Sequence, residues 1–216
     1  MKKRSAIAID GPAGAGKSTV AKLVASKLKL TYIDTGAMYR AVTLAAIGES
    51  IDLENEEDLV GVAKRIEIKL VGNKIYVNGQ DVSSDIRRPE ITAKTRYAAK
   101  NEGVRHHLVA LQKELGKDGG VVMEGRDIGS VVLKDTGYKF YLDARVEERA
   151  RRRYEELLLK GKEIDLEEVK RQIIARDKSD TERPNSPLVR LKEAIYIDTT
   201  GLTIEEVAER IVKEVR

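Results

Sequence analysis

The stretch that decides the fold lies near the start of the chain, where Ser5-Ala-Ile-Ala-Ile9 precedes Gly11-Pro-Ala-Gly-Ala-Gly-Lys-Ser18. The first five residues are small and apolar, which is typical of a strand buried in a parallel sheet. The glycines then interrupt regular structure, and the apolar residues between Lys17 and Lys29 recur at helical spacing. A strand, a glycine-rich loop and a helix in this order predict the first unit of a parallel α/β sheet.

Four further short apolar runs predict the other strands, at residues 31–33, 120–123, 138–142 and 194–197. Helical patterns separate these runs, at about residues 37–47, 90–115, 146–160 and 203–215. Strands that alternate with helices favour a parallel sheet covered by helices. We therefore expect the α/β class.

One segment departs from this alternation. Residues 66–70 and 74–77 each alternate apolar and polar side chains with period two, and Gly72-Asn73 forms the turn between them. Asn78-Gly79 predicts a second turn. This pattern predicts an antiparallel meander inside a small insertion at residues 52–105.

Composition narrows the class of protein further. The 216 residues amount to about one and a half domains of ordinary size, which favours one core with an added subdomain. The chain has no cysteine, so disulfides, thiolate zinc sites and cysteine nucleophiles are excluded. Because no apolar run approaches the roughly 18 residues of a membrane-spanning helix, we expect a cytoplasmic protein.

The glycine-rich loop matches the pattern G-x-x-x-x-G-K-[ST] in full. Its backbone N–H groups and the start of the following helix form a concave site for anions. Lys17 can reach the β- and γ-phosphates, and the Ser18 hydroxyl can ligate Mg²⁺. We predict a nucleoside-triphosphate site with Mg²⁺ as the cofactor, formed by Gly11, Pro12, Ala13, Gly14, Ala15, Gly16, Lys17, Ser18 and Thr19.

The loop alone does not identify the phosphoryl acceptor. Neither the Asp-x-x-Gly nor the Asn-Lys-x-Asp element of a GTPase is present. Val121-Val-Met-Glu124 and Phe140-Tyr-Leu-Asp143 both offer the acidic strand end of a motor ATPase, although Asp143 also suits a helix N-cap. The chain is short for a motor with a coupling domain, which favours a small-molecule kinase.

Arginines at two strand ends indicate a second phosphate site. Asp34-Thr-Gly-Ala-Met-Tyr-Arg40 follows a predicted strand, with a glycine turn that we expect to expose Thr35. Glu124-Gly-Arg-Asp127 ends another strand, at the carboxyl edge where open α/β sheets bind ligands. Arginine suits phosphate because its planar guanidinium donates two hydrogen bonds at once. Surface salt bridges and a tight turn remain the alternatives for these two motifs.

The helical pattern at 146–160 is dense in arginine and glutamate. Arg151 and Arg152 have acidic residues four positions away on both sides. Arg145, Arg149 and Arg153 form a separate stripe that has none, so an external anion is the expected partner. We interpret the stripe as the phosphate clamp of a lid, with a solvated helix face as the alternative.

Together these motifs resemble the bacterial cytidylate kinase family over essentially the whole chain. The resemblance rests on the Gly11–Thr19 loop, Asp34–Arg40, Gly125-Arg-Asp-Ile-Gly129, Glu148–Arg153, the Arg176-Asp177…Asp180…Arg183 series and Ile197-Asp-Thr-Thr200. The family has Asp where this chain has Glu124. The resemblance implies a P-loop kinase fold, with a five-stranded parallel sheet, helices on both faces, a monophosphate-binding insertion and an Arg-rich helical lid.

The resemblance also assigns segments and residues. It implies a core at 1–51, 106–144 and 184–216, the insertion at 52–105, and a lid with its following helix at 145–183. Lys17, Arg126, Arg149 and Arg153 would act in catalysis. CMP or dCMP would be bound at its phosphate by Thr35, Tyr39, Arg40 and Arg126, at the cytosine by Thr95, Arg105, Asp127 and Arg183, and at the sugar side by Arg176 and Asp180.

The reaction implied is transfer of the γ-phosphoryl group of ATP to CMP or dCMP. A P-loop kinase for another nucleotide or a small metabolite is the nearest alternative. A basic nucleic-acid-binding ATPase is a second one, but the net charge is only +4, and few aromatics and no basic tail are present. We expect a monomer that binds neither polynucleotides nor membranes.

Overall fold

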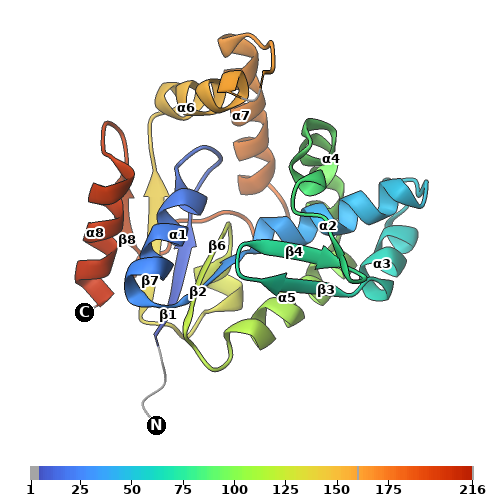
Figure 1. Cartoon of the computed structure of the whole chain (residues 1–216), viewed down its shortest axis with the longest axis horizontal. Helices are drawn as coiled ribbons and strands as arrows, with labels where there is room; N and C mark the ends of the chain where they lie inside the picture. The colour runs from blue at the N-terminus through green and yellow to red at the C-terminus, as the bar shows by residue number, and fades with distance from the viewer. Residues whose placement is uncertain (1–4, 160, 216) are drawn as a thin grey trace.

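A five-stranded parallel sheet forms the centre of the computed structural model, which describes residues 5–159 and 161–215 (Figure 1). The predicted core includes residues 1–4 and 216, and the predicted helix at 146–160 includes residue 160; these residues lie outside the described part of the chain. In spatial order the strands are β2 (Thr31–Asp34), β6 (Val121–Gly125), β1 (Ala6–Asp10), β7 (Tyr138–Asp143) and β8 (Ile195–Asp198). This confirms the predicted α/β fold.

Both faces of the sheet are covered, which explains the nearly continuous apolar runs. Ile7 and Ile9 point to the face that carries α1 (Lys17–Leu28) and α8 (Ile204–Val215). Ala8, between them, belongs to a second cluster on the opposite face, with the helical turn η2 (Ile128–Val132) and Val109 of α5 (Glu102–Gly116). Full burial of an isoleucine contributes about 1.5–3 kcal/mol, so both faces stabilise the sheet.

The insertion contains the predicted antiparallel meander. Its strands are β3 (Ile68–Val71), β4 (Lys74–Val77) and β5 (Gln80–Asp81), joined at Gly72 and Gly79 by turns with positive φ. The same region holds three helical segments, α3 (Glu56–Arg65), η1 (Asp85–Arg87) and α4 (Pro89–Lys100). The meander lies beside α2 (Thr35–Gly48), to one side of the central sheet (Figure 1).

The single helix predicted over residues 90–115 is wrong, because it is divided at Asn101 into α4 and α5. Asn101 adopts an extended backbone and caps α5, accepting a hydrogen bond from the Val104 N–H at 3.0 Å. Its amide also donates to the Glu56 carbonyl at 3.0 Å. The apolar periodicity did not reveal the break because both helices have apolar faces; the signal was the local one of an Asn at the N-cap of α5.

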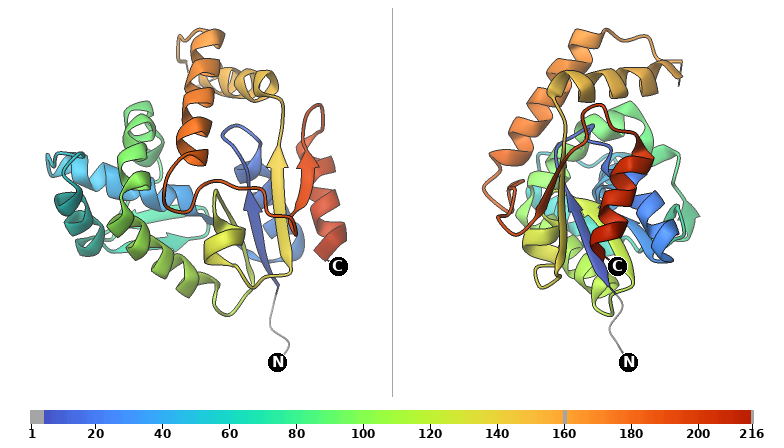
Figure 2. Two further views of the ribbon diagram at one scale, coloured as in Figure 1. Left: turned by 180° about the vertical axis from the view of Figure 1, so that it is seen from behind. Right: turned by 90° about the vertical axis from the view of Figure 1, so that its left-hand side faces the viewer.

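Helices α6 (Val146–Leu159) and α7 (Leu166–Thr181) project beyond the carboxyl ends of the strands (Figure 2). They pack on each other through a small cluster of their own, which includes Ala150, Leu157 and Ile173. The pair therefore meets the core chiefly at the edge where the glycine-rich loop lies. Within the part of the chain that the structure describes, no helix combines the length and hydropathy needed to cross a membrane.

Candidate active site

The glycine-rich loop connects β1 to α1 and depends on backbone conformations that favour glycine. Gly11 has φ +149°, and a Cβ there would lie 2.0 Å from the Leu142 carbonyl oxygen of the neighbouring strand. Gly16 adopts the left-handed region at φ +85° and precedes the first residue of α1. The predicted loop therefore has the strand before it and the helix after it that an anion site requires.

Lys17 is buried at the start of α1, and its ammonium group donates to the Pro12 carbonyl at 2.6 Å. Burial and the nearby positive charge of Arg126 together lower its pKa to about 7, against the opposing effect of Glu124. A polyanion bound beside this buried lysine would stabilise the charged ammonium form and so raise its pKa.

Ser18 donates its hydroxyl hydrogen to the carboxylate of Glu124 at 2.5 Å. Tyr32 on β2 donates to the same oxygen at 3.2 Å, and burial beside Glu124 raises the pKa of the phenol. Glu124 is itself buried at the end of β6, next to β1 in the sheet. The acidic strand end considered from the sequence thus contacts the hydroxyl of the glycine-rich loop.

Asp10, which the sequence analysis did not single out, ends β1 directly before the loop. Its two carboxylate oxygens accept hydrogen bonds from the N–H groups of Ile128 at 2.9 Å and Gly129 at 2.8 Å. Burial raises its pKa to about 6 in spite of these two bonds. The side chain fixes the turn that follows Asp127, and the only sequence signal was an acidic residue at a strand end.

A buried cluster of charges lies around Asp127. Arg105 of α5 donates to one oxygen of its carboxylate, and Arg183 lies 3.5 Å from the other. Arg183 also donates to the Ser186 carbonyl at 2.6 Å, while its buried Nη2 has no hydrogen-bond partner among the described residues. The guanidinium of Arg105 lies 5.6 Å from the centre of the Tyr39 ring. Four predicted site residues from separate segments are therefore brought together.

Arg126 directly precedes Asp127, and its charge acts on Lys17 of the glycine-rich loop. Its Nε donates to Asp180 of α7 at 2.7 Å. Burial opposes the charge of Arg126, but the interaction with Asp180 raises its pKa above the ordinary value. The charges of Arg126 and Arg176 both act on Lys17, and those of Arg40 and Arg153 also act on Arg176. Cations predicted on distant segments therefore converge on one region.

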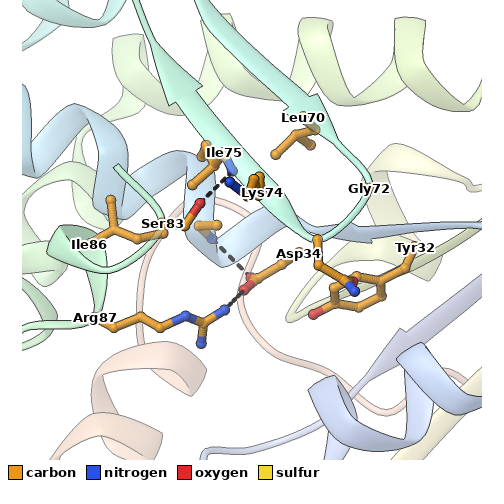
Figure 3. A pocket seen from close by; sticks show the side chains of 11 residues that line it. Tyr32, Asp34, Leu70, Gly72, Lys74, Ile75, Ser83, Ile86 and Arg87 are labelled. Carbon is orange, nitrogen blue, oxygen red and sulfur yellow. Dashed lines mark hydrogen bonds and ion pairs between the residues drawn. The ribbon is translucent and has the colours of Figure 1, made fainter. Parts of the chain in front are cut away.

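Asp34 organises the start of α2. It caps the helix by accepting from the Ala37 N–H at 2.9 Å, and it accepts from Arg40 at 2.8 Å. Arg87 of the insertion lies 3.8 Å from the same carboxylate, and these groups border a small pocket against the β3–β4 hairpin (Figure 3). The expectation that a turn exposes Thr35 is wrong, because α2 begins there and its buried hydroxyl donates to the Glu124 carbonyl at 2.8 Å.

The arginine stripe on α6 is not the unpaired row that was predicted. Arg149 is buried, and it donates to Asp177 of α7 and to the Ala13 carbonyl of the loop at 2.9 Å. Arg153 is bonded to Glu156, three residues on, at 2.7 Å. Arg145 is exposed, and its charge acts on Asp198. Acidic partners three residues away or on another element do not belong to the spacing-four pattern from which the stripe was predicted.

Thr95 is buried on α4, and its hydroxyl donates to the Ile91 carbonyl of the same helix at 2.7 Å. This bond satisfies the hydroxyl hydrogen within the helix, so the oxygen can only accept hydrogen bonds from another group, through its two lone pairs. The bonds of the Thr95 hydroxyl therefore do not join it to the Asp127 cluster.

Comparison with known proteins places this arrangement in a family. A family model described as cytidylate kinase matches residues 7–216. A cytidylate kinase of Bacillus subtilis is 52% identical over 219 residues, covering 100% of this chain and 98% of the relative. One of Caldanaerobacter subterraneus is 53% identical over 210 residues, covering 97% and 94%.

Solved structures resemble the chain in fold. An uncharacterised protein from Eubacterium ventriosum superposes with a TM-score of 0.56 at 12% identity, covering 99% of this chain and 98% of its own. A shikimate kinase from Acinetobacter baumannii has a TM-score of 0.50 at 17% identity, covering 99% and 94%. The fold is thus shared with P-loop kinases, while the sequence matches are far more specific, and the chain belongs to the cytidylate kinase family.

Proposed function

We propose that the protein transfers the γ-phosphoryl group of ATP to CMP or dCMP, forming CDP or dCDP, with Mg²⁺ as cofactor. The observation that carries this proposal is the position of the Asp127 cluster relative to the loop. In this family member, Arg126 directly precedes Asp127 of the cluster, and its charge acts on Lys17 of the triphosphate loop. Donor and acceptor would therefore meet at one edge of the sheet.

The chemistry of Asp127 and its two arginines favours cytosine over uracil. Cytosine presents an amino donor beside two acceptors, so a carboxylate can accept from the amino group while a guanidinium donates to an acceptor. Uracil has a carbonyl in place of the amino group, which would face the carboxylate. Because an unpaired buried polar group is costly, this arrangement discriminates between the two bases.

On the donor side, Lys17 would bind the β- and γ-phosphates, and the N–H groups of Gly11–Thr19 would surround them. The oxygens of Ser18 and Glu124 lie together at the loop and are hard ligands, which suits Mg²⁺ brought in with the nucleotide. Bound there, Mg²⁺ would neutralise charge on the phosphates. Arg126, Arg149 and Arg153 would add cations around the transferring group.

On the acceptor side, Thr35, Tyr39, Arg40 and Arg126 would hold the monophosphate. Arg176 and Asp180 would contact the sugar side, and Thr95 would reach the base. The acceptor phosphate is already an anionic nucleophile, so no side chain needs to act as a strong base. Closure of the insertion (52–105) and the α6–α7 lid (145–183) over both nucleotides would exclude water and prevent hydrolysis of ATP. We expect the enzyme to act as a cytoplasmic monomer.

The test is a coupled assay of ADP formation with ATP, Mg²⁺ and separate acceptors: CMP, dCMP, UMP, AMP and shikimate. We expect the highest kcat/KM with CMP or dCMP. A preference for another nucleotide or for shikimate would replace this proposal with a different P-loop kinase. ATP hydrolysis stimulated by polynucleotide, with a steep loss of affinity as salt rises, would replace it with a nucleic-acid ATPase.

A further inference from the structure

Asp177 joins three separate parts of the molecule. One oxygen of its carboxylate accepts a hydrogen bond from the Ala13 N–H of the glycine-rich loop at 3.0 Å. The other accepts from Nη1 of Arg149 on α6. Asp177 itself belongs to α7, and it is 164 positions from Ala13 in the sequence. This carboxylate has no assigned role in the function proposed above.

We propose that Asp177 is a positioning residue that holds the guanidinium of Arg149 above the donor loop, an inference that rests on the proposed phosphoryl transfer. Arg149 donates through Nε to the Ala144 carbonyl at 2.9 Å and through Nη1 to the Ala13 carbonyl at 2.9 Å as well as to Asp177. Among residues 5–159 and 161–215, no group accepts a hydrogen bond from Nη2. The bonded atoms fix the plane of the guanidinium, and Nη2 keeps two donors for a phosphate.

Burial makes the contact strong enough for this role. The side chains of Arg149 and Asp177 are 10% and 18% exposed, so solvent screens the pair far less than it screens an ion pair on the surface. The loop also packs directly on α6, since a Cβ added at Gly14 would lie 3.0 Å from both the Cβ and the carbonyl oxygen of Arg149. Ala13 and Arg149 are therefore in direct contact, and the carboxylate of Asp177 accepts a hydrogen bond from each of them.

A second carboxylate on helix α7 also contacts an arginine of the site. Asp180, one helical turn after Asp177, is bonded to Arg126 on the acceptor side. Helix α7 thus bonds both to Arg149 on the donor side and to Arg126 on the acceptor side. Among the described residues, removal of Asp177 would leave Arg149 bonded only to the Ala144 and Ala13 carbonyls, with the more distant Asp143 as its remaining ion pair, while the Asp180 contact stays in place.

A double-mutant cycle between Asp177 and Arg149 tests the proposal. We expect Asp177→Ala to lower kcat by roughly tenfold to a hundredfold, the range for a displaced catalytic group. In an Arg149→Ala background the same change should alter kcat by less than about twofold, because Asp177 would act only through Arg149. Equal fold-losses in the two backgrounds, or an unchanged kcat in the single variant, would overturn the proposal.

Two further variants keep the test independent of folding and of the proposed function. Asp177→Asn retains an oxygen for the Ala13 N–H but loses the charge beside Arg149, so kcat should fall while the Ala13 amide stays protected from hydrogen exchange. Asp177→Ala should lose that protection. Glu167→Gln, an exposed change on the same helix, should leave both readouts unchanged.

The amide exchange is measured on the full chain without nucleotide. An unprotected Ala13 amide in the unsubstituted protein would overturn the contact itself. If that protein phosphorylates no acceptor in the panel, the proposed function fails, and with it the role of Arg149 in transfer. The two failures are therefore distinguishable.

Discussion

The Nε of Arg126 donates to Asp180 at 2.7 Å, which joins the end of β6 to α7 across 54 positions of sequence. Both side chains are largely buried, at 16% and 14% exposure. Removing one partner from such a pair leaves a buried charge without compensation. The resulting loss of stability is larger than any stabilisation that the intact pair provides relative to apolar residues.

We expect Asp180→Ala to lower the free energy of unfolding by roughly 3 kcal/mol, because Arg126 would keep its charge without a partner. The same substitution should cost much less in an Arg126→Ala background. Urea unfolding followed by circular dichroism measures both differences. If the two backgrounds gave the same loss, the pair would not be coupled.

Binding of ATP should take up a proton through Lys17. The pKa of Lys17 is lowered to about 7 by burial and by the charge of Arg126, so at pH 8 the group is mostly neutral before nucleotide binds. The triphosphate would raise this pKa and favour the ammonium form. We expect nearly one proton to be taken up at pH 8, and apparent affinity to fall as pH rises above about 7.

Titration calorimetry of ATP at pH 8, in buffers that differ in ionisation enthalpy, measures that proton. A Lys17→Met variant should bind with little uptake and should show no turnover. Equal uptake by the variant and the unsubstituted protein would assign the proton to another group.

Asp10 should make stability depend on pH in the mildly acidic range. Its pKa is about 6 in the folded protein and 3.8 in the unfolded chain, so between these values only the folded state holds the proton. The free energy of unfolding should therefore fall as pH rises from about 4 to 6, by roughly 3 kcal/mol from this group.

An Asp10→Asn variant keeps one acceptor and cannot titrate, so the difference in unfolding free energy between it and the unsubstituted protein should change across this window. A difference that stayed constant across this window would contradict the assignment.

Substitution of Asp127 should change which base is accepted. Asp127→Asn places an amide donor where the carboxylate accepts, so kcat/KM for CMP should fall by about tenfold to a hundredfold while that for UMP falls less or rises. Asp127→Ala should lose selectivity without gaining UMP activity. Initial rates with both nucleotides measure the ratio, and an unchanged preference for CMP in either variant would show that Asp127 does not select the base.

The fold could be predicted from local sequence patterns because the residues of most strands and helices favour the structure that they adopt. The short apolar runs predicted the five strands, and the glycine loop predicted the turn into α1. The division of helix 90–115 was missed although Asn101 caps α5 through a local bond to the Val104 N–H; only its second bond, to the Glu56 carbonyl 45 positions away, depends on tertiary structure. The same limit applied to Arg149 of α6, whose partner Asp177 lies on α7. The Arg153–Glu156 pair, at a spacing of three, is local.

The sequence by itself determined that a triphosphate loop stands between a buried strand and a helix, and that arginines occur at the strand ends. The reason is that glycine torsions, apolar periodicity and side-chain chemistry are local properties. Only the tertiary structure decided that Asp10 holds the turn after Asp127, that Glu124 meets Ser18, and that Asp177 joins Ala13 to Arg149. A carboxylate bonds to the groups that lie close to it in space, and the packing of the sheet and the helices determines which groups these are.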